Sequence, residues 1–405
     1  MSLTRSAGAL VAFMWFAYFL NYCDRQAVFS MFPALRADLR MTDGQLGLVG
    51  SLFLWVYAFG CPASGILGDR FSKRLLVVLS LVVWSIVTLG TGLVASGSML
   101  LVMRAAMGVS ESLYMSSAVA LTAAAYPAGQ RSRAVSVLMT GQIAGTVAGS
   151  WFGGWMADRG QWRDAFFILG GVGIAFALPY FNFLRRLEEP APEAGPGFSF
   201  AGLGRSRTFL LLCAVFPVFV FGLWLLYGWL PAFLHDKFHL SQADAAFNAT
   251  VYLQSATLVG VLGGGMLADR LSRRVRAARF WLLVAGLGLS APCMHALGSC
   301  DTLAVTRLAA TGFGLFSGLF IANIFPAAFD VVAPGTRATA VGLLNFCGAL
   351  MSGFATLFGG LWKQSLGIDR LLSLTALAGL AAAAALVLGI RRFFPSDHPQ
   401  TPSSS

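Results

Sequence analysis

Five charged residues lie inside stretches of the sequence that are otherwise apolar: Asp24, Arg25, Arg104, Glu111 and Arg307. A charged side chain at the centre of a bilayer costs about 2.5–3.5 kcal/mol on insertion scales, so such residues persist mainly where function needs them. Carboxyl groups can bind and release protons, whereas guanidinium groups donate hydrogen bonds to carboxylates and other anions. The same charges can also neutralise each other in buried salt bridges that only hold helices together, and this structural alternative stays open.

The spacing of residues near the first pair of charges predicts how a helix presents them. Tyr18, Asn21, Tyr22 and Arg25 follow the i, i+3, i+4, i+7 pattern, which places them in one polar stripe that faces a protein or water interior. Asp24 lies beside this stripe, about 100° from Arg25 around the helix.

A second helix is expected to carry Arg104 and Glu111 on one face. The two residues are seven positions apart, which corresponds to about 10 Å along a helix axis. In the second half of the chain Arg307 occupies the place of Arg104, but Gly314 stands seven positions later, where the first half has an acid. Groups that can exchange protons are therefore concentrated in the first half.

The composition predicts a membrane protein. Hydrophobic residues make up 57% of the 405 residues and charged residues only 11%, and the mean hydropathy is +0.74. A globular core of this size cannot bury so much apolar surface, so a soluble enzyme is excluded. Apolar runs of about 20 residues, the length that crosses a bilayer, predict helices near 8–32, 44–67, 75–94, 99–125, 134–157, 165–184, 208–234, 248–267, 279–298, 302–327, 338–362 and 370–390.

The predicted fold class is therefore all-α, with twelve transmembrane helices in two halves. The first six-helix half covers 1–184, and the second covers 208–392. Between them, 185–207 is rich in Glu, Pro and Gly, a composition typical of a solvated linker. We expect this linker to be cytoplasmic and 393–405 to be a disordered cytoplasmic tail.

The basic residues are distributed unevenly across the predicted membrane. Eighteen of the 28 Lys and Arg residues lie at the termini, in the linker and in the turns on one predicted side, and seven lie on the other side. By the positive-inside rule, both termini then face the cytoplasm. The net charge of +11 is explained by this orientation and by contact with lipid headgroups, so no nucleic-acid partner is expected.

Several other functional signals are missing from the sequence. No cleavable signal peptide, metal-ligand spacing or disulfide framework is apparent, and no GxxxxGK[ST] phosphate loop occurs. We therefore expect no metal, no other cofactor and no ATP-driven pump within this chain.

A ten-residue motif occurs twice in the chain. Residues 65–74 read GILGDRFSKR and residues 265–274 read GMLADRLSRR, so the chain is duplicated, and each copy is expected to form a short basic turn between two helices. The pattern resembles the signature loop of the major facilitator superfamily of secondary transporters. This resemblance implies alternating access, in which the charged residues of the two turns act as latches that bias two arrangements. These residues are Asp69, Arg70, Asp269 and Arg270.

Two shorter motifs in the first half sharpen the resemblance. Residues 21–25 read NYCDR and residues 104–111 read RAAMGVSE. They resemble motifs of the anion:cation symporters, which import sugar acids such as hexuronates with protons, and of the spinster-like group, which is associated with lysolipid and sphingolipid export. In both branches the resemblance implies that Asp24 and Glu111 take part in proton coupling, while the arginines of the two motifs bind anionic substrate or hold the carboxylates.

General electrostatics explains why such a cluster can couple protons to an anion. A carboxylate near an arginine is ionised, and removing water or bringing in an anionic substrate favours its protonated form. Substrate binding at Arg25 or Arg104 and protonation of Asp24 or Glu111 then assist each other. A symporter needs this reciprocity.

Other polar and aromatic residues are candidate substrate contacts. In transporters built from repeats, the substrate lies near the bilayer midplane between the halves, where amides and aromatic rings can recognise hydroxyl groups. Packing or anchoring at the membrane interface is the alternative for each aromatic residue. In addition to Tyr18, Asn21 and Tyr22, these candidates are Gln142, Trp224, Tyr227, Tyr252, Gln254, Asn323 and Asn345.

A glycine recurs every fourth residue at Gly141, Gly145, Gly149 and Gly153. Such a seam of small residues lets two helices approach closely. The resemblance to the superfamily implies that this seam belongs to the interface that opens and closes, and close packing alone is the alternative.

Together these features predict a transporter rather than an enzyme. The hypothesis is a monomeric, multi-pass protein of a bacterial inner membrane that imports a small organic anion, such as a sugar acid or another carboxylate, by symport with protons. The proton gradient would be its energy source. A spinster-like exporter of lipids, lysolipids or drugs is the alternative with the same fold, and the 34 phenylalanines are compatible with it. A receptor or scaffold is disfavoured because it would have little reason to keep charges inside the membrane.

Overall fold

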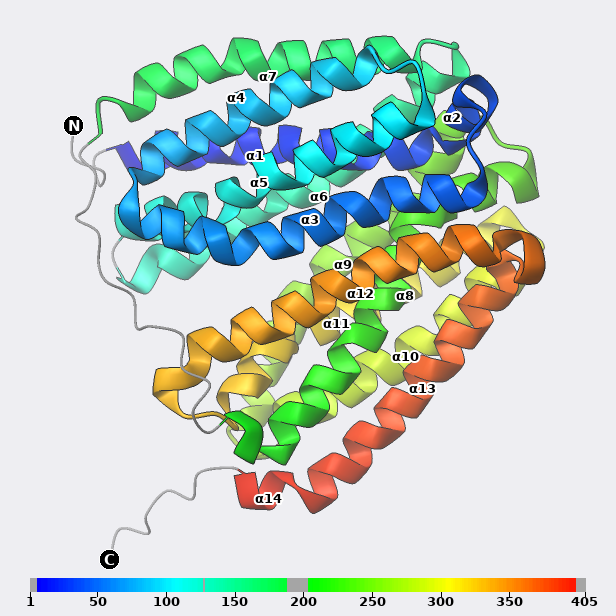
Figure 1. The fold of residues 1–405 in the computed structure, drawn as a ribbon. Coiled ribbons are helices and arrows are strands. Elements are labelled where there is room, and N and C mark those ends of the chain that lie inside the picture. Colours follow the sequence, from blue (N-terminus) through cyan, green and yellow to red (C-terminus); the bar gives the residue numbers. More distant parts are fainter. Residues whose placement is uncertain (1–5, 127, 188–202, 398–405) are drawn as a thin grey trace, which may run out of the picture. The chain divides into compact units, whose positions relative to one another are not determined.

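The computed structural model describes residues 6–126, 128–187 and 203–397, and all regular structure within these ranges is helical (Figure 1). Two helices of this part are short, α2 (Phe32–Leu39) and α14 (Phe394–Asp397), and two 3-10 turns cover Leu203–Arg205 and Pro334–Thr336. The other twelve helices have at least 20 residues each. They are α1 (Ala7–Ser30), α3 (Asp43–Arg70), α4 (Lys73–Gly92), α5 (Gly97–Ala125), α6 (Ala128–Asp158), α7 (Trp162–Leu184), α8 (Arg207–Phe238), α9 (Gln242–Ser272), α10 (Ala278–Ser299), α11 (Leu303–Phe329), α12 (Arg337–Leu366) and α13 (Ile368–Arg392).

These lengths confirm the predicted all-α membrane fold. Nine helices of the described ranges are long and apolar enough to cross a bilayer, namely α3, α4 and α7 to α13. The remaining long helices, α1, α5 and α6, contain 24, 29 and 31 residues, more than the roughly 20 that a span requires.

Side-chain caps define where several helices begin. Thr42 forms a capping box at the start of α3: its hydroxyl accepts a hydrogen bond from the Gln45 backbone N–H at 3.2 Å, and the Gln45 side chain accepts one from the Thr42 backbone N–H at 2.9 Å. The hydroxyls of Ser72, Ser96 and Thr302 likewise accept a hydrogen bond from a backbone N–H in the first turn of α4, α5 and α11, without the reciprocal bond of a capping box. These bonds satisfy N–H groups that a helix leaves unpaired at its first turn.

Two boundaries differ from the sequence-based prediction. The first helix was expected to continue to residue 32, but α1 ends at Ser30 and the separate helix α2 follows. The residue after α2, Arg40, is in the left-handed conformation with φ of 52°. The repeated basic motif is also more helical than expected. α3 continues through Arg70 and α9 through Ser272, so most of each motif is the last turns of a helix.

The chain divides into two compact units, and each is described by itself. Unit one contains α1 to α7 together with Tyr227–Thr250 and Thr356–Leu361. In this unit α1 packs along α6, α3 along α5, and α4 along α5 and α7.

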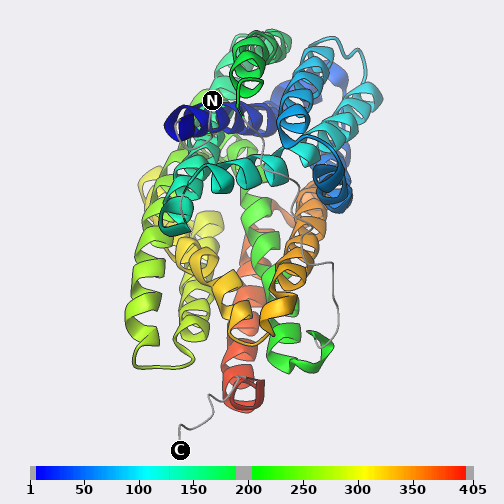
Figure 2. The same cartoon turned by 90° about the vertical axis from the view of Figure 1, so that its left-hand side faces the viewer.

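Unit two contains the first part of α8 up to Leu226, Val251–Ala355, and the chain from Trp362 onward. In this unit α10 packs along α11 and α13. The turn between α9 and α10 is visible as the yellow-green loop in the lower left of Figure 2.

The predicted glycine seam lies between α6 and α1, inside unit one. A Cβ atom added at Gly141 would lie 2.9 Å from the Trp15 carbonyl oxygen, and one at Gly153 would lie 2.6 Å from the Ala27 carbonyl oxygen. Added Cβ atoms at Gly145 and Gly149 would also lie against the α1 backbone. The seam thus packs two helices of one unit, which favours the close-packing interpretation over a moving interface.

Candidate functional site

The centre of the candidate site is a buried ion pair between α1 and α5. Arg25 donates hydrogen bonds from Nη2 and Nε to Glu111 Oε2, at 2.7 and 3.3 Å. The exposed fractions of the two side chains are 6% and 0%, so neither charge is solvated by bulk water. Breaking such a pair by removing one partner leaves an uncompensated charge and costs about 3–5 kcal/mol.

The polar stripe predicted on α1 faces the inside of unit one. Tyr18, Asn21, Tyr22 and Arg25 are all buried. Arg25 also donates to the Tyr22 hydroxyl at 3.3 Å and to Asn21 Oδ1 at 3.5 Å. One turn earlier, the Tyr18 hydroxyl donates to Gln142 Oε1 on α6 at 3.1 Å. The structure therefore brings these predicted residues into one connected polar region.

Aromatic rings enclose the Arg25 guanidinium. Its central carbon lies 4.6 Å from the ring centroids of Tyr22 and Phe53 and 5.0 Å from that of Tyr57. Phe53 and Tyr57 come from α3 and were not among the residues predicted from the sequence. Cations over aromatic faces are stabilised by up to about 2 kcal/mol when desolvated.

The same Phe53 ring also faces the second arginine of the site. Arg104 lies with its guanidinium carbon 4.8 Å from the Phe53 centroid. Its Nε donates to the Val49 carbonyl oxygen at 3.2 Å, and Nη1 contacts the Met107 sulfur at 3.2 Å. Phe53 therefore lies against both guanidinium groups of the cluster.

Three polar atoms of this cluster have unused hydrogen-bonding capacity. Asp24 Oδ1, Glu111 Oε1 and Arg104 Nη2 are buried and have no hydrogen-bond partner among the described residues. The two carboxyl oxygens can accept a proton, and the guanidinium nitrogen can donate to an anion. The arrangement thus combines proton acceptors and an anion donor in one buried region of unit one.

A substitution at Phe53 tests the shared aromatic contact. Phe53→Leu should lower Tm more than Phe166→Leu, because both changes remove buried ring area but only Phe53 faces two cations. Thermal unfolding of the detergent-purified variants provides the comparison. Equal losses of Tm would mean that the ring contributes packing alone.

The amides predicted in the second half have different environments in unit two. Asn323 donates to the Leu319 carbonyl oxygen of its own helix at 2.9 Å and to the Gly264 carbonyl oxygen at 3.5 Å, so it stabilises the contact of α11 with α9. Gln254 is buried, and its Nε2 has no hydrogen-bond partner among the described residues. Asn345 is exposed on α12.

The predicted aromatic candidates are spread over both units. Tyr252 lies under the Arg307 guanidinium in unit two, with 5.5 Å between the guanidinium carbon and the ring centroid. Trp224 belongs to unit two and Tyr227 to unit one, and both are half-buried on α8.

Of the four predicted latch residues, only the two in the second copy of the motif have described side chains. Asp269 and Arg270 are exposed in the last turns of α9, whereas the side chains of Asp69 and Arg70 lie outside the described residues. Their role as latches stays a prediction.

Unit one contains a contact between distant parts of the sequence that no motif indicated. Asp158, the last residue of α6, accepts hydrogen bonds from the first backbone N–H groups of α9, from Gln242 at 2.7 Å and from Ala243 at 2.9 Å. A carboxylate at a helix N-terminus is favoured by the unpaired N–H groups and by the helix dipole.

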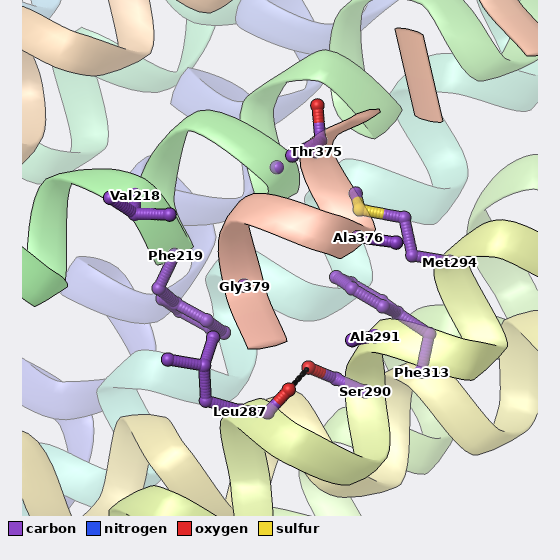
Figure 3. A pocket seen from close by; sticks show the side chains of 11 residues that line it. Val218, Phe219, Leu287, Ser290, Ala291, Met294, Phe313, Thr375, Ala376 and Gly379 are labelled. Atoms are coloured by element: carbon purple, nitrogen blue, oxygen red, sulfur yellow. Dashed lines mark hydrogen bonds between the residues drawn. The ribbon is translucent and has the colours of Figure 1, made fainter. Parts of the chain in front are cut away.

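A small cavity in unit two is too small and too apolar to be a substrate site. It measures about 20 Å³ and lies among α8, α10, α11 and α13, next to Phe219, Met294 and Phe313 (Figure 3). The Ser290 hydroxyl at its edge already donates to the Leu287 carbonyl oxygen at 2.9 Å. One water molecule would fill such a volume, but it would need two or more free polar partners.

Twelve long helices among the described residues, with a charged pair buried between two of them, are the architecture of a multi-pass membrane protein. Residues 14–356 match the Major Facilitator Superfamily, and the chain belongs to this family. Two of its relatives are named as transporters, one as a probable sulfoacetate transporter and one as a hexuronate transporter.

Three relatives illustrate the range of this similarity. The chain is 30% identical over 302 residues to a probable sulfoacetate transporter of Cupriavidus necator, covering 69% of each chain. It is 25% identical over 324 residues to a hexuronate transporter of Bacillus subtilis, covering 76% of each. It is 29% identical over 336 residues to human protein spinster homolog 1, a match that covers 77% of this chain and 62% of that protein's length.

Solved structures agree with the fold. A crystal structure of a bacterial homolog of the human lysosomal transporter spinster, in an inward-facing and occupied conformation, superimposes with a TM-score of 0.84 at 21% identity over 98% of this chain and 99% of that one. A second structure of such a homolog, inward-facing and unoccupied, gives a TM-score of 0.81 at 22% identity, also over 98% of this chain and 99% of that one.

Proposed function

We propose that this transporter moves a small organic anion together with protons. The observation that carries this proposal is the buried Arg25–Glu111 pair, together with the unpartnered oxygens of Asp24 and Glu111 and the unpartnered Nη2 of Arg104. An entering carboxylate or sulfonate would accept hydrogen bonds from the guanidinium groups and compete with Glu111 for Arg25. Relatives named for sulfoacetate and hexuronate, both anions, support the same substrate class.

The coupling would follow from the cost of an unpaired buried charge. When the substrate takes over Arg25, Glu111 loses its counterion, and the protonated carboxyl becomes the cheaper form in this desolvated region. Substrate and proton then bind with mutual assistance, and each makes the other's binding tighter. Asp24, buried one residue before Arg25, would be the second proton acceptor.

Alternating access would carry both ligands across the membrane. The hydrogen bonds from Gln242 and Ala243 to Asp158 are candidates for contacts made in one state and broken in the other. We further propose that the chain acts as a monomer in a bacterial inner membrane and that the proton gradient supplies the energy. The asymmetry of its basic residues supports an orientation with both termini in the cytoplasm.

Binding measurements on variants test the substrate class. Glucuronate should raise the Tm of the wild-type protein, because a ligand that binds only the folded state stabilises it. Arg25→Lys and Arg104→Lys should each weaken this binding by about tenfold, because Lys keeps the charge but loses the planar fork that holds a carboxylate. Trp224→Gln should have a much smaller effect.

The opposite pattern would disprove the anion site. Glucuronate affinity that is unchanged in both Lys variants but is lost in Trp224→Gln would show that the arginines do not bind the substrate. The second candidate, a spinster-like exporter of lipid or lysolipid, is favoured by the similarity to human spinster homolog 1. A rise in Tm with lysolipid and with no sugar acid would support that candidate.

A further inference from the structure

An elongated groove of about 520 Å³ lies on unit two between α9 and α11. On α9 its wall is formed by Val259, Gly263, Met266 and Arg270, spaced i, i+4, i+7 and i+11 so that they form one stripe along the helix. Across the groove, Leu315 and Leu319 of α11 form the other wall. Its volume is within the range of about 300–1,000 Å³ that small-molecule sites occupy.

Glycines create this space. Gly260 and Gly264 let α9 approach α11 closely, since Cβ atoms added there would contact Leu315 and Leu319. Gly263 is different, because a Cβ atom added there would meet nothing within 4 Å. The absence of a side chain at Gly263 therefore widens the groove and is not required for helix packing.

The groove is apolar along its length and positively charged at one end. Val259 and Met266 are each 60% exposed. The exposed Arg270 lies at the positively charged end. The following turn adds three more exposed arginines, Arg273, Arg274 and Arg276, whereas Asp269 is the one acid in this stretch of the sequence. The twelve residues from Val259 to Arg270 span about 16 Å of helix, roughly half of the 30 Å hydrocarbon core.

We propose that this groove binds one acyl chain of an anionic phospholipid, with the phosphate held by Arg270. The apolar stripe has the depth of one leaflet, and its only charged lining residue lies at the end where the headgroup of such a lipid would be. Basic pockets between transmembrane helices are a known mode of recognition for anionic headgroups. A soluble organic anion would use Arg270 but leave the apolar stripe unused. No residue that lines the groove belongs to the Arg25–Glu111 cluster, so the lipid proposal does not depend on the proposed transport function.

Native mass spectrometry of the full-length protein with added phosphatidylglycerol tests the proposal. Arg270→Gln removes the charge. Gly263→Leu places a side chain in the groove at a position where an added Cβ atom meets nothing within 4 Å. Each should reduce the retained phosphatidylglycerol by about fivefold, and phosphatidylcholine should bind more weakly than phosphatidylglycerol to the wild-type protein. The matched controls are Arg391→Gln, an exposed arginine in the last turn of α13, and Gly265→Leu, a glycine of the same helix that also has no neighbour within 4 Å but does not line the groove.

One groove variant removes a charge and the other reduces the volume of the groove, so one misfolded variant does not decide the result. Phosphatidylglycerol retention equal to wild type in both groove variants would overturn the proposal. Equal losses in the groove variants and in the controls would overturn it as well, because the lipid would then bind by surface charge or bulk hydrophobicity alone.

Discussion

Proteoliposomes that contain the Glu111→Gln variant are expected to exchange substrate across the membrane but not to accumulate it against a gradient. Gln keeps the shape of the side chain and one acceptor oxygen, so Arg25 still has a polar neighbour at the place of the 2.7 Å contact. It cannot change its protonation, so movement of the substrate is no longer linked to movement of a proton. Asp24→Asn should have the same effect if the second carboxyl also takes part.

The measurement is uptake of labelled substrate with and without an inward proton gradient. Asp164→Asn is a suitable control, because Asp164 is an exposed acid in the first turn of α7 and should accumulate substrate as the wild type does. If Glu111→Gln and Asp24→Asn both reach wild-type accumulation driven by the gradient, neither carboxyl couples protons.

The second large effect is expected on folding. Gly149→Val should prevent α1 and α6 from packing, because an added Cβ atom would lie against the Cys23 Cα, carbonyl carbon and oxygen. These are backbone atoms, which cannot move aside as a flexible side chain can, so the cost should exceed the roughly 1–3 kcal/mol of ordinary overpacking.

The yield of monodisperse protein in size-exclusion chromatography and its Tm provide the measurement. Gly171→Val serves as the control, because a Cβ atom at Gly171 on α7 would have no neighbour within 4 Å. A Gly149→Val protein with the yield and Tm of Gly171→Val would show that α1 and α6 do not pack in this way.

The fold could be predicted well because the length of each membrane-spanning helix is visible in the sequence as the length of an apolar run. The long helices and the family follow from run lengths and from the repeated motif, and both are confirmed for the described residues. The duplication stays a prediction. Boundaries were less predictable. No polar residue marks the end of α1 after Ser30, because the next residues, Met31 and Phe32, are apolar and buried.

Helical spacing also predicted which side chains of α1 share a face, but it could not identify their partners on other helices. Arg104 faces the same way as Glu111 along α5, yet its hydrogen bond goes to the Val49 backbone of α3, which no residue pattern reveals. The rings of Phe53 and Tyr57 around Arg25 were missed for a related reason. With 34 phenylalanines in the chain, an aromatic residue in an apolar helix gives no signal of its own.

Asn323 shows that a polar residue in an apolar helix can have backbone partners that the sequence does not indicate. Polar residues in apolar helices were candidates for substrate contact, but Asn323 has its donor occupied by backbone carbonyls of α11 and α9. A buried amide can be satisfied locally by the carbonyl four residues earlier, and the sequence does not distinguish this arrangement from a binding role.

The most direct test of proton-coupled anion transport is the internal pH of proteoliposomes after glucuronate is added outside. With wild-type protein, a trapped pH indicator should report acidification of the interior as labelled glucuronate enters, and the Glu111→Gln variant should show no acidification. Entry of glucuronate into wild-type proteoliposomes without any change of internal pH would contradict proton symport through Glu111.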